Sequence, residues 1–202
     1  MKTLRVNCDS DGINTTVKSI KEGKIVVFPT DTVYGIGCDP YNKEAVEKVY
    51  RIKNRKQGKL FPVLGFSKNE LEKIANFNEK ANKIAEKFWP GQLTLILPLK
   101  DEKLKTSMNL ENKVAVRVPN NSCALAILEQ CNLIIGTSAN VSGMESFVDP
   151  DECEKNISDY DVFVDGGKIS SEGESTVIEI SEDEVVVHRK GSISKEEILN
   201  LF

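Results

Sequence analysis

The sequence predicts an α/β fold: a single domain, residues 1–202, built on one open, twisted sheet of mixed strands with flanking helices. Short apolar runs rich in β-branched residues alternate along the chain with segments of helical periodicity. The alternation is irregular, which predicts antiparallel strands at the sheet edges. At 202 residues, with 40% apolar and 29% charged residues, the chain can bury a sizeable core and has an ordinary globular composition.

Helical periodicity and capping residues place the helices. Ser67 with Glu70, and Ser194 with Glu197, have the spacing of capping boxes, and Asn42 can cap a further helix. Helices are predicted over residues 13–20, 45–50, 71–75, 81–88 and 122–130, from Asp149-Pro150 onward, and after Ser194.

Apolar runs bounded by turn residues place the strands. They are predicted over residues 25–28, 61–66, 93–97, 114–118, 133–136 and 162–164, followed by a hairpin of 176–180 and 185–188 around the turn 181–184. The connection between 97 and 114 is predicted to be a polar, lysine-containing loop. Residues 168–174 are small and polar, so we expect a mobile segment that could act as a lid.

Composition and charge exclude several classes of protein. No apolar run approaches the roughly 20 residues that span a bilayer, and the N-terminus has no signal-peptide apolar region, so we expect a cytoplasmic protein with no membrane contact. The net charge of −4 makes an overall nucleic-acid-coating role unfavourable, so any anion site must be local. The five cysteines contain no CxxC pair, which argues against structural zinc, and most are expected to be buried thiols in a reducing compartment.

A row of hydroxyls follows the first buried strand. Thr30, Thr32 and Tyr34 come after Pro29, and in an extended chain the period of two would put all three on one side. Two glycines follow, which let the backbone turn or approach a ligand closely. A strand end that presents hydrogen-bonding groups is typical of ligand sites in open α/β sheets, although a simple turn with solvated hydroxyls is an equal alternative.

A group of cations follows the helix that contains Val46, Val49 and Tyr50. Lys53 falls where that helix's apolar stripe would continue, and it belongs to five cations without an intervening acid: Arg51, Lys53, Arg55, Lys56 and Lys59. Such a concentration in an acidic chain favours an anion site, phosphate above all, over a solvated loop.

Polar residues recur at other strand ends. Arg117 interrupts an apolar strand, so it has either a buried partner or a ligand, and its fork suits a carboxylate. Further hydroxyl, amide and guanidinium groups occur at Thr94, Ser138, Asn140, Ser175 and Arg189. Each is more often structural than functional, but together they predict one polar site without a metal-ligand set or a glycosidase carboxylate pair.

These motifs, in this order, resemble the YrdC-like threonylcarbamoyl-AMP synthases. The resemblance covers about residues 15–195 and rests on Pro29–Gly37, Lys53-x-Arg55, Lys59 with Pro62, Phe88–Thr94, Val116–Pro119, Thr137–Gly143 and Ser175-Thr176. It implies an open, twisted α/β sheet with a large, positively lined concave cavity, and the short form of the family without an extra C-terminal domain.

The resemblance also implies an activity. L-threonine, bicarbonate and ATP would become threonylcarbamoyl-adenylate and pyrophosphate, and a separate transferase complex would move the threonylcarbamoyl group onto tRNA. Mg²⁺ would be held mainly by the ATP phosphates. Lys53 and Arg55 are then the expected catalytic and phosphate-binding residues, and Lys59, Thr94, Asn140 and Arg189 the further nucleotide-binding ones. Threonine or its carbamate would be bound by Thr30, Thr32, Tyr34, Pro62, Arg117, Ser138 and Ser175.

The chain departs from the family pattern at three positions. Lys56, Leu60 and Lys190 stand where the family usually has proline, so these loops lack the backbone restraint of the proline ring. Two alternatives therefore stay open. One is an RNA-binding or ribosome-maturation module that uses the same basic cavity, and the other is a family paralogue that has lost the reaction.

Overall fold

The computed structural model describes residues 3–56, 59–171, 173–181 and 184–202. Parts of three predicted features lie outside the described residues. They are residues 182 and 183 of the hairpin turn, Gly58 within the cation group, and residue 172 of the expected lid. The predicted α/β fold with mixed strands and flanking helices is confirmed. Hydrogen bonds, however, divide the strands between two sheets rather than one.

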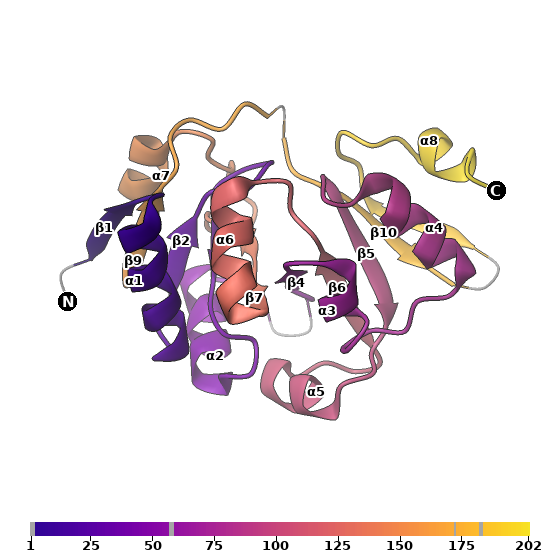
Figure 1. Ribbon diagram of the computed structural model, residues 1–202, viewed down its shortest axis with the longest axis horizontal. Helices are drawn as coiled ribbons and strands as arrows, with labels where there is room; N and C mark the ends of the chain where they lie inside the picture. The colour runs from indigo at the N-terminus through magenta and orange to yellow at the C-terminus, as the bar shows by residue number, and fades with distance from the viewer. Residues whose placement is uncertain (1–2, 57–58, 172, 182–183) are drawn as a thin grey trace.

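The first sheet lies toward the N-terminal end of the molecule (Figure 1). Its spatial order is β1 (Leu4–Asn7), β9 (Val162–Asp165), β2 (Val26–Phe28), β3 (Gly35–Gly37) and β8 (Thr137–Ser138). The pairs β1–β9 and β9–β2 are parallel, whereas β2–β3 and β3–β8 are antiparallel.

The second sheet lies toward the C-terminal end. Its spatial order is β11 (Val185–Arg189), β10 (Thr176–Ile180), β5 (Leu93–Pro98), β6 (Lys113–Arg117), β4 (Pro62–Gly65) and β7 (Leu133–Ile135). The predicted hairpin is confirmed, since β10 and β11 are antiparallel. The pairs β10–β5 and β4–β6 are parallel, and β5–β6 and β4–β7 are antiparallel.

Residues 133–138 carry the chain from one sheet to the other. Strand β7 pairs with β4 of the second sheet, whereas β8 pairs with β3 of the first. Between them, the Gly136 N–H donates to Pro62 O at 2.9 Å. A Cβ on Gly136 would lie 2.2 Å from Leu64 Cδ1, so a larger residue would have to displace the buried Leu64 side chain. This crossing is the reason that the strands do not form the single expected sheet.

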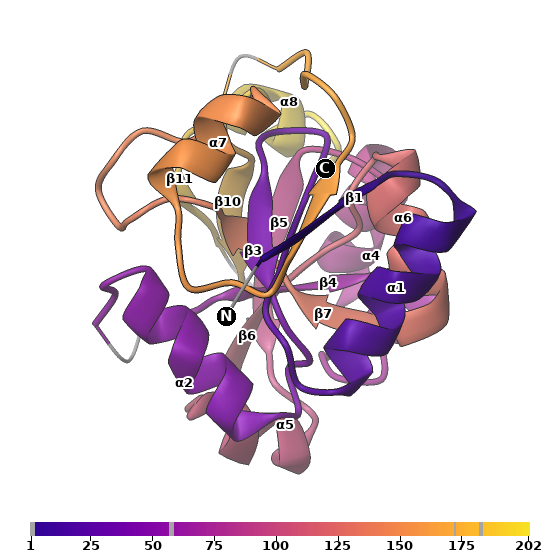
Figure 2. The ribbon, with the colours of Figure 1, turned by 90° about the vertical axis from the view of Figure 1, so that its left-hand side faces the viewer.

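Helices cover the sheets on several sides (Figures 1 and 2). They are α1 (Ser10–Lys21), α2 (Lys43–Ile52), α3 (Lys68–Leu71), α4 (Glu79–Phe88), α5 (Glu102–Met108), α6 (Ser122–Cys131), α7 (Pro150–Asn156) and α8 (Lys195–Leu199). Helices α1 and α6 lie side by side and share a buried cluster with Val26 and Phe28 of β2. Val27 belongs to the other cluster with α2, so β2 is buried on both faces as predicted.

Most predicted helix boundaries are confirmed by their caps. Asn42 accepts a hydrogen bond from Ala45 N at 3.0 Å, and Ser194 and Glu197 form a complete capping box. Ser67 begins α3, but its side chain caps nothing, so the capping box predicted there is wrong. The short helix is held instead by Leu71, which is fully buried.

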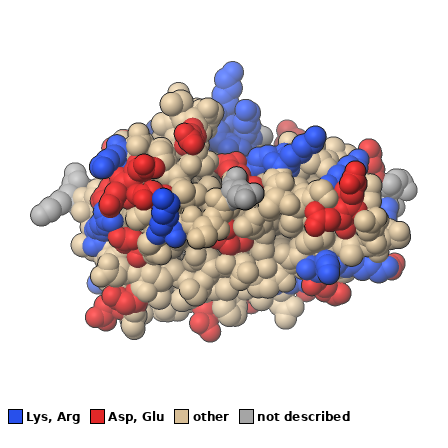
Figure 3. All heavy atoms as spheres, turned by 90° about the horizontal axis from the view of Figure 1, so that it is seen from above, with Lys and Arg blue, Asp and Glu red and all other residues tan. Residues whose placement is uncertain are grey.

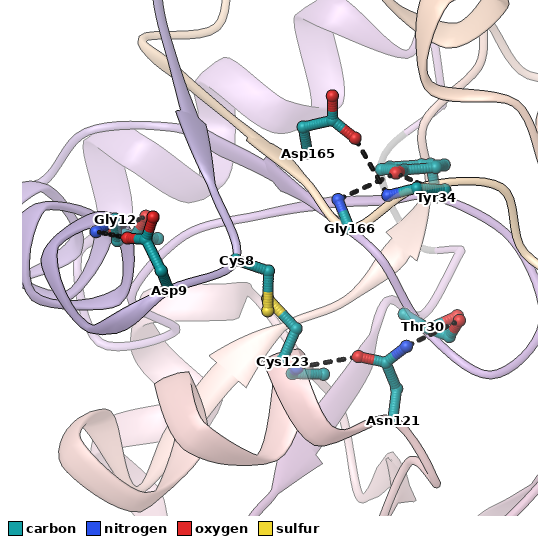
Figure 4. Close-up of a disulfide and its surroundings, with 12 residues drawn as sticks. Cys8, Asp9, Gly12, Thr30, Tyr34, Asn121, Cys123, Asp165 and Gly166 are labelled. Carbon is teal, nitrogen blue, oxygen red and sulfur yellow. Dashed lines mark hydrogen bonds between the residues drawn. A yellow bond between two sulfur atoms is a disulfide. The ribbon is translucent and has the colours of Figure 1, made fainter.

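Three further features differ from the sequence prediction. The connection predicted as a loop between 97 and 114 contains α5, because Asp101 caps the helix and Leu104 and Met108 bury its inner face. Strand β1, which has only one partner strand in its sheet, was not predicted. Cys8 and Cys123 form a disulfide, so two of the five cysteines are not the expected free thiols (Figure 4).

Candidate functional site

One face of the second sheet forms the floor of a cavity of about 510 Å³. Alternate residues of its strands point to this face, as the period of two requires: Thr94 and Ile96 of β5, Lys113, Ala115 and Arg117 of β6, Val177 and Glu179 of β10. The intervening residues, such as Leu95, Val116 and Ile178, belong to the hydrophobic core. The strand pattern therefore gives the sheet one apolar face and one face that lines the cavity.

Loops from the first sheet form the opposite wall. Thr30 and Thr32 line the cavity from the segment between β2 and β3, Gly35 lines it from β3, and Ser138 lines it from β8. Asn121, the cap of α6, donates to Thr30 O at 3.3 Å and so ties this wall to the helix (Figure 4). The cavity thus lies between residues of both sheets.

The three hydroxyls of the first loop do not share one side. Thr30 Oγ1 donates to Val33 O at 2.7 Å and accepts from Thr32 N and Val33 N, which bends the chain and ends the alternation. Thr30 and Thr32 line the cavity, 3.0 Å apart at their hydroxyls. The Tyr34 hydroxyl instead donates to Gly167 O and accepts from Gly166 N (Figure 4). The expectation that all three face one way is therefore wrong.

Arg117 has the buried partner predicted as one role of a charge within a strand, and it also faces the cavity. It lines the cavity, and its Nη2 lies 2.6 Å from Asp31 Oδ1 in a buried ion pair. Its other nitrogens donate to Gly91 O and Thr32 Oγ1. Burial lowers the pKa of Arg117, and Asp31 acts in the opposite direction. The second oxygen of Asp31 is buried without a hydrogen-bond partner.

Lys53 lies behind the cavity wall rather than in it. The residue is 1% exposed, and its Nζ donates to Ser138 O and, at 2.9 Å each, to Asn140 O and Oδ1. Ser138 Oγ in turn donates to Asn140 Oδ1 at 2.7 Å. Burial lowers the pKa of Lys53 to about 8, with the charge of Arg55 acting in the same direction. Lys53 therefore holds the conformation of residues 138–140.

Arg55 brings a positive charge to the cavity. Its guanidinium lies over the Phe61 ring at 5.0 Å and donates to Leu60 O, while its Nε is buried without a partner. Burial lowers the pKa of Arg55. Lys59 and Pro62 also line the cavity, so this side is strongly cationic despite the acidic balance of the whole chain.

A third guanidinium, that of Arg189, lines the cavity beside β10. Arg189 Nε and Nη2 donate to Ser175 O and Oγ at 2.9 Å each, and Ser175 Oγ lies 3.0 Å from Thr94 Oγ1. Arg189 Nη1 pairs with the carboxylate of Glu174, which also lines the cavity. Farther along the sheet, Glu179 binds both Lys113 Nζ and His188 Nε2.

The structure brings most of the predicted site residues together. Those that line the cavity are Thr30, Thr32, Arg55, Lys59, Pro62, Thr94, Arg117, Ser138, Ser175 and Arg189. Lys53, Asn140 and Tyr34 do not line it and support its walls from behind. The sequence analysis missed Asp31, Glu174, Lys113, Glu179 and His188. A charge within a strand, the signal used for Arg117, could have identified Lys113, Glu179 and His188.

The site suits polyanions and offers no metal cage. Three guanidinium groups and a row of hydroxyls surround one space, which can orient phosphates and carboxylates. Among the described residues, no three His, Cys, Asp or Glu side chains are grouped as metal ligands. No helix in the described part of the chain is long and apolar enough to cross a membrane.

The chain is similar in sequence and fold to known proteins. The family Sua5_yciO_yrdC, described as "Telomere recombination", matches residues 18–191. A threonylcarbamoyl-AMP synthase of Bacillus subtilis is 38% identical over 187 residues, which are 89% of this chain and 53% of that protein. This chain therefore spans about half the length of that relative.

Two solved structures have the same fold along the chain. The crystal structure of Pyrococcus abyssi Sua5 complexed with L-threonine gives a TM-score of 0.89 at 32% identity, covering 100% of this chain and 61% of that one. Escherichia coli YciO gives a TM-score of 0.87 at 26% identity and covers 98% of both chains. The order of motifs, the fold and these matches together show that the chain belongs to the Sua5/YciO/YrdC family.

Proposed function

We propose that this chain is a threonylcarbamoyl-AMP synthase, a nucleotidyltransferase that makes threonylcarbamoyl-adenylate and pyrophosphate from L-threonine, bicarbonate and ATP. The observation that carries the proposal is the single cavity in which Arg55, Arg117 and Arg189 converge with hydroxyls from both sheets. The relative named threonylcarbamoyl-AMP synthase and the P. abyssi Sua5 complex with L-threonine support it.

In this reaction the protein mainly has to position the substrates and neutralise the negative charge of the triphosphate. The threonine amine and bicarbonate first give a carbamate and water. A carbamate oxygen then attacks the α-phosphorus of ATP. The bond between the α-phosphorus and the oxygen that bridges it to the β-phosphate breaks, which releases pyrophosphate. Arg55 and Arg189 would bind phosphate oxygens, with Lys59 nearby. Thr30, Thr32, Ser138 and Ser175 would orient the carbamate and threonine.

Arg117 and Lys53 would act differently from each other. Arg117 uses three N–H groups on Gly91, Thr32 and Asp31, which leaves two of its five for a substrate carboxylate. Lys53 would be a positioning residue that fixes Ser138 and Asn140, and a direct phosphate contact by Lys53 would require it to release one of its present partners. Tyr34 and Pro62 would shape the walls.

We expect Mg²⁺ to enter with the nucleotide. The carboxylates that line the cavity, Glu174 and Glu179, are each paired with a cation, so the phosphate oxygens would be the main ligands. The ion would neutralise charge that develops on the leaving pyrophosphate. The product would pass to a separate transferase complex that modifies tRNA, and we place these steps in the cytoplasm.

The RNA-binding alternative has no specific observation in its favour. On the face seen in Figure 3, Lys and Arg gather near the upper middle, but Asp and Glu lie on both sides of them. That face therefore offers no continuous basic stripe for an RNA backbone. Contact with tRNA stays a prediction.

The test is pyrophosphate release from ATP and bicarbonate with L-threonine, L-serine or L-alanine. Release should require L-threonine. Arg55→Ala should lower kcat/KM for ATP by about 10²-fold, because one preorganised cation on the phosphates is lost. Arg51→Ala is the matched control, since Arg51 is exposed one turn away and does not line the cavity, and it should stay within about twofold. Equal activity with all three amino acids would overturn the assignment.

A further inference from the structure

The carboxylate of Glu174 lies where a substrate anion would be expected. Glu174 precedes β10 and lines the cavity. Its Oε1 accepts from Ser146 Oγ at 2.6 Å, and its Oε2 pairs with Arg189 Nη1. These are a hydroxyl and a guanidinium, the two donor types that bind phosphate and carboxylate oxygens. An anion of the chain itself therefore occupies donors suited to a ligand.

Other charges and hydroxyls of the site also act on Glu174. Burial alone would raise its pKa, but Ser146, Arg189, Ser138 and Lys53 together hold the pKa below its usual value. The charge of Glu174 in turn opposes the lowering of the pKa of Lys53 and Arg55. The carboxylate is thus ionised at neutral pH and interacts with the cations expected to bind phosphate.

Glu174 also joins the two sides of the cavity. On one side, Ser146 Oγ lies 3.5 Å from Asn140 Nδ2, and Asn140 is bound by Lys53. On the other side, Arg189 holds Ser175, whose hydroxyl lies beside Thr94 on the sheet floor. The side chain of Glu174 is 27% exposed, so solvent and ligands can reach it.

We propose that Glu174 is a specificity-determining residue: its carboxylate holds the place of a substrate anion, and only a polyanion replaces it readily. This inference rests on the proposed function, in which the cavity takes a triphosphate. A single small anion that displaces Glu174 makes contacts with Ser146 and Arg189 similar to those that Glu174 loses, so it gains little free energy. An anion that binds beside Glu174 is repelled by its negative charge. A triphosphate gains further contacts with Arg55 and its neighbours, so it offsets the displacement. The cavity would then reject phosphate and other small anions that are abundant beside ATP.

A purely structural bridge makes a different prediction. Glu174→Gln keeps the shape and can still hydrogen-bond to Ser146 and Arg189, but it removes the charge. If Glu174 only ties the walls together, this loss of charge should tighten phosphate binding no more than the same loss elsewhere in the cavity does. If Glu174 holds the place of an anion, the variant should bind phosphate much more tightly, because the ligand then displaces a neutral amide rather than a carboxylate.

Calorimetric titration of the full chain with inorganic phosphate, pyrophosphate and triphosphate decides between these roles. In Glu174→Gln, the Kd for phosphate should fall about tenfold, and the preference for triphosphate over phosphate should shrink. Glu179→Gln is the matched control, because it removes the same charge from the same cavity beside Lys113 and His188. It should change the Kd for phosphate by less than about threefold.

Two further variants keep the test sharp. Glu174→Ala should also tighten phosphate binding, whereas Glu174→Asp, which keeps the charge, should bind phosphate as weakly as the wild type. Thermal unfolding checks that each variant is folded. Unchanged or weaker phosphate binding by folded Glu174→Gln and Glu174→Ala would overturn the inference. Pyrophosphate release is measured separately. Its absence in the wild type would contradict the proposed function, whereas the comparison of phosphate Kd values would still decide the role of Glu174.

Discussion

Lys53 is a buried charge whose ammonium group donates to one short segment, residues 138–140. Its Nζ donates to three oxygens of Ser138 and Asn140, and its pKa is lowered from 10.5 to about 8, first by burial. Because the charged form is disfavoured in the folded protein, the unfolded chain binds more protons between about pH 8 and 10.5. This group therefore makes the free energy of unfolding rise with pH across that window.

We predict that Lys53→Met removes this pH dependence. Urea unfolding of the wild type and the variant at several values between pH 7.5 and 10.5 measures the slopes. Lys56→Met, at an exposed position in the same segment, should keep the slope of the wild type. Parallel slopes for wild type and Lys53→Met would contradict the assigned pKa.

Individual residues differ in how far the sequence predicts them. Arg117 was predictable because a charge within an apolar strand demands a partner, and it has Asp31. Tyr34 was not, because the turn made by the Thr30 hydroxyl cancels the alternation. Glu174 gave no local signal either, since Ser146 and Arg189 lie 28 and 15 residues away.

Helix α6 connects local capping to the site. Asn121 accepts from Ala124 N at 3.0 Å through Oδ1, and its Nδ2 donates to Thr30 O. Asn78 caps α4 in the same way but has no bond to the Thr30 loop. Asn121→Ala should lower stability by about 1 kcal/mol and also raise the KM for L-threonine, whereas Asn78→Ala should only lower stability.

Chemical denaturation and steady-state kinetics of both variants check this prediction. An equal KM in Asn121→Ala and Asn78→Ala would show that the contact with Thr30 does not position the loop. The comparison is informative because both substitutions remove an equivalent cap, whereas the amide of Asn121 donates to Thr30 O and that of Asn78 donates to Ser181 O, away from the Thr30 loop.

Elements with strong local signals were predictable, and those without were not. The capped amphipathic helices and the apolar strands follow from spacing alone. Helix α5 was missed because Leu104 and Met108 are its only buried residues, and two apolar positions among polar ones are too few to show helical periodicity. Strand β1 was missed because it is mostly exposed and is defined by its pairing with β9, far along the chain.

At the scale of the whole molecule, the Cys8–Cys123 disulfide links the start of α1 to α6 across 115 residues. Nothing in the spacing of the five cysteines indicates this pairing. We predict three titratable thiols in the denatured, unreduced protein, from Cys38, Cys131 and Cys153, and five after reduction.

Reduction should also lower the free energy of unfolding by about 2–4 kcal/mol, because the open loop gains entropy in the unfolded chain. Guanidinium unfolding with and without dithiothreitol measures the difference. Cys8→Ser should make stability independent of the reductant. Five thiols before reduction would show that the bond is absent in solution.

The cavity takes its floor from one sheet and its wall from the other, with residues 133–138 crossing between them. A ligand bound in the cavity would therefore contact both sheets and stabilise their position relative to each other. Amide protons in β5 and in β3 should then exchange more slowly together when the cavity is filled. One small molecule should slow amide exchange in both sheets because the residues that line the cavity come from both.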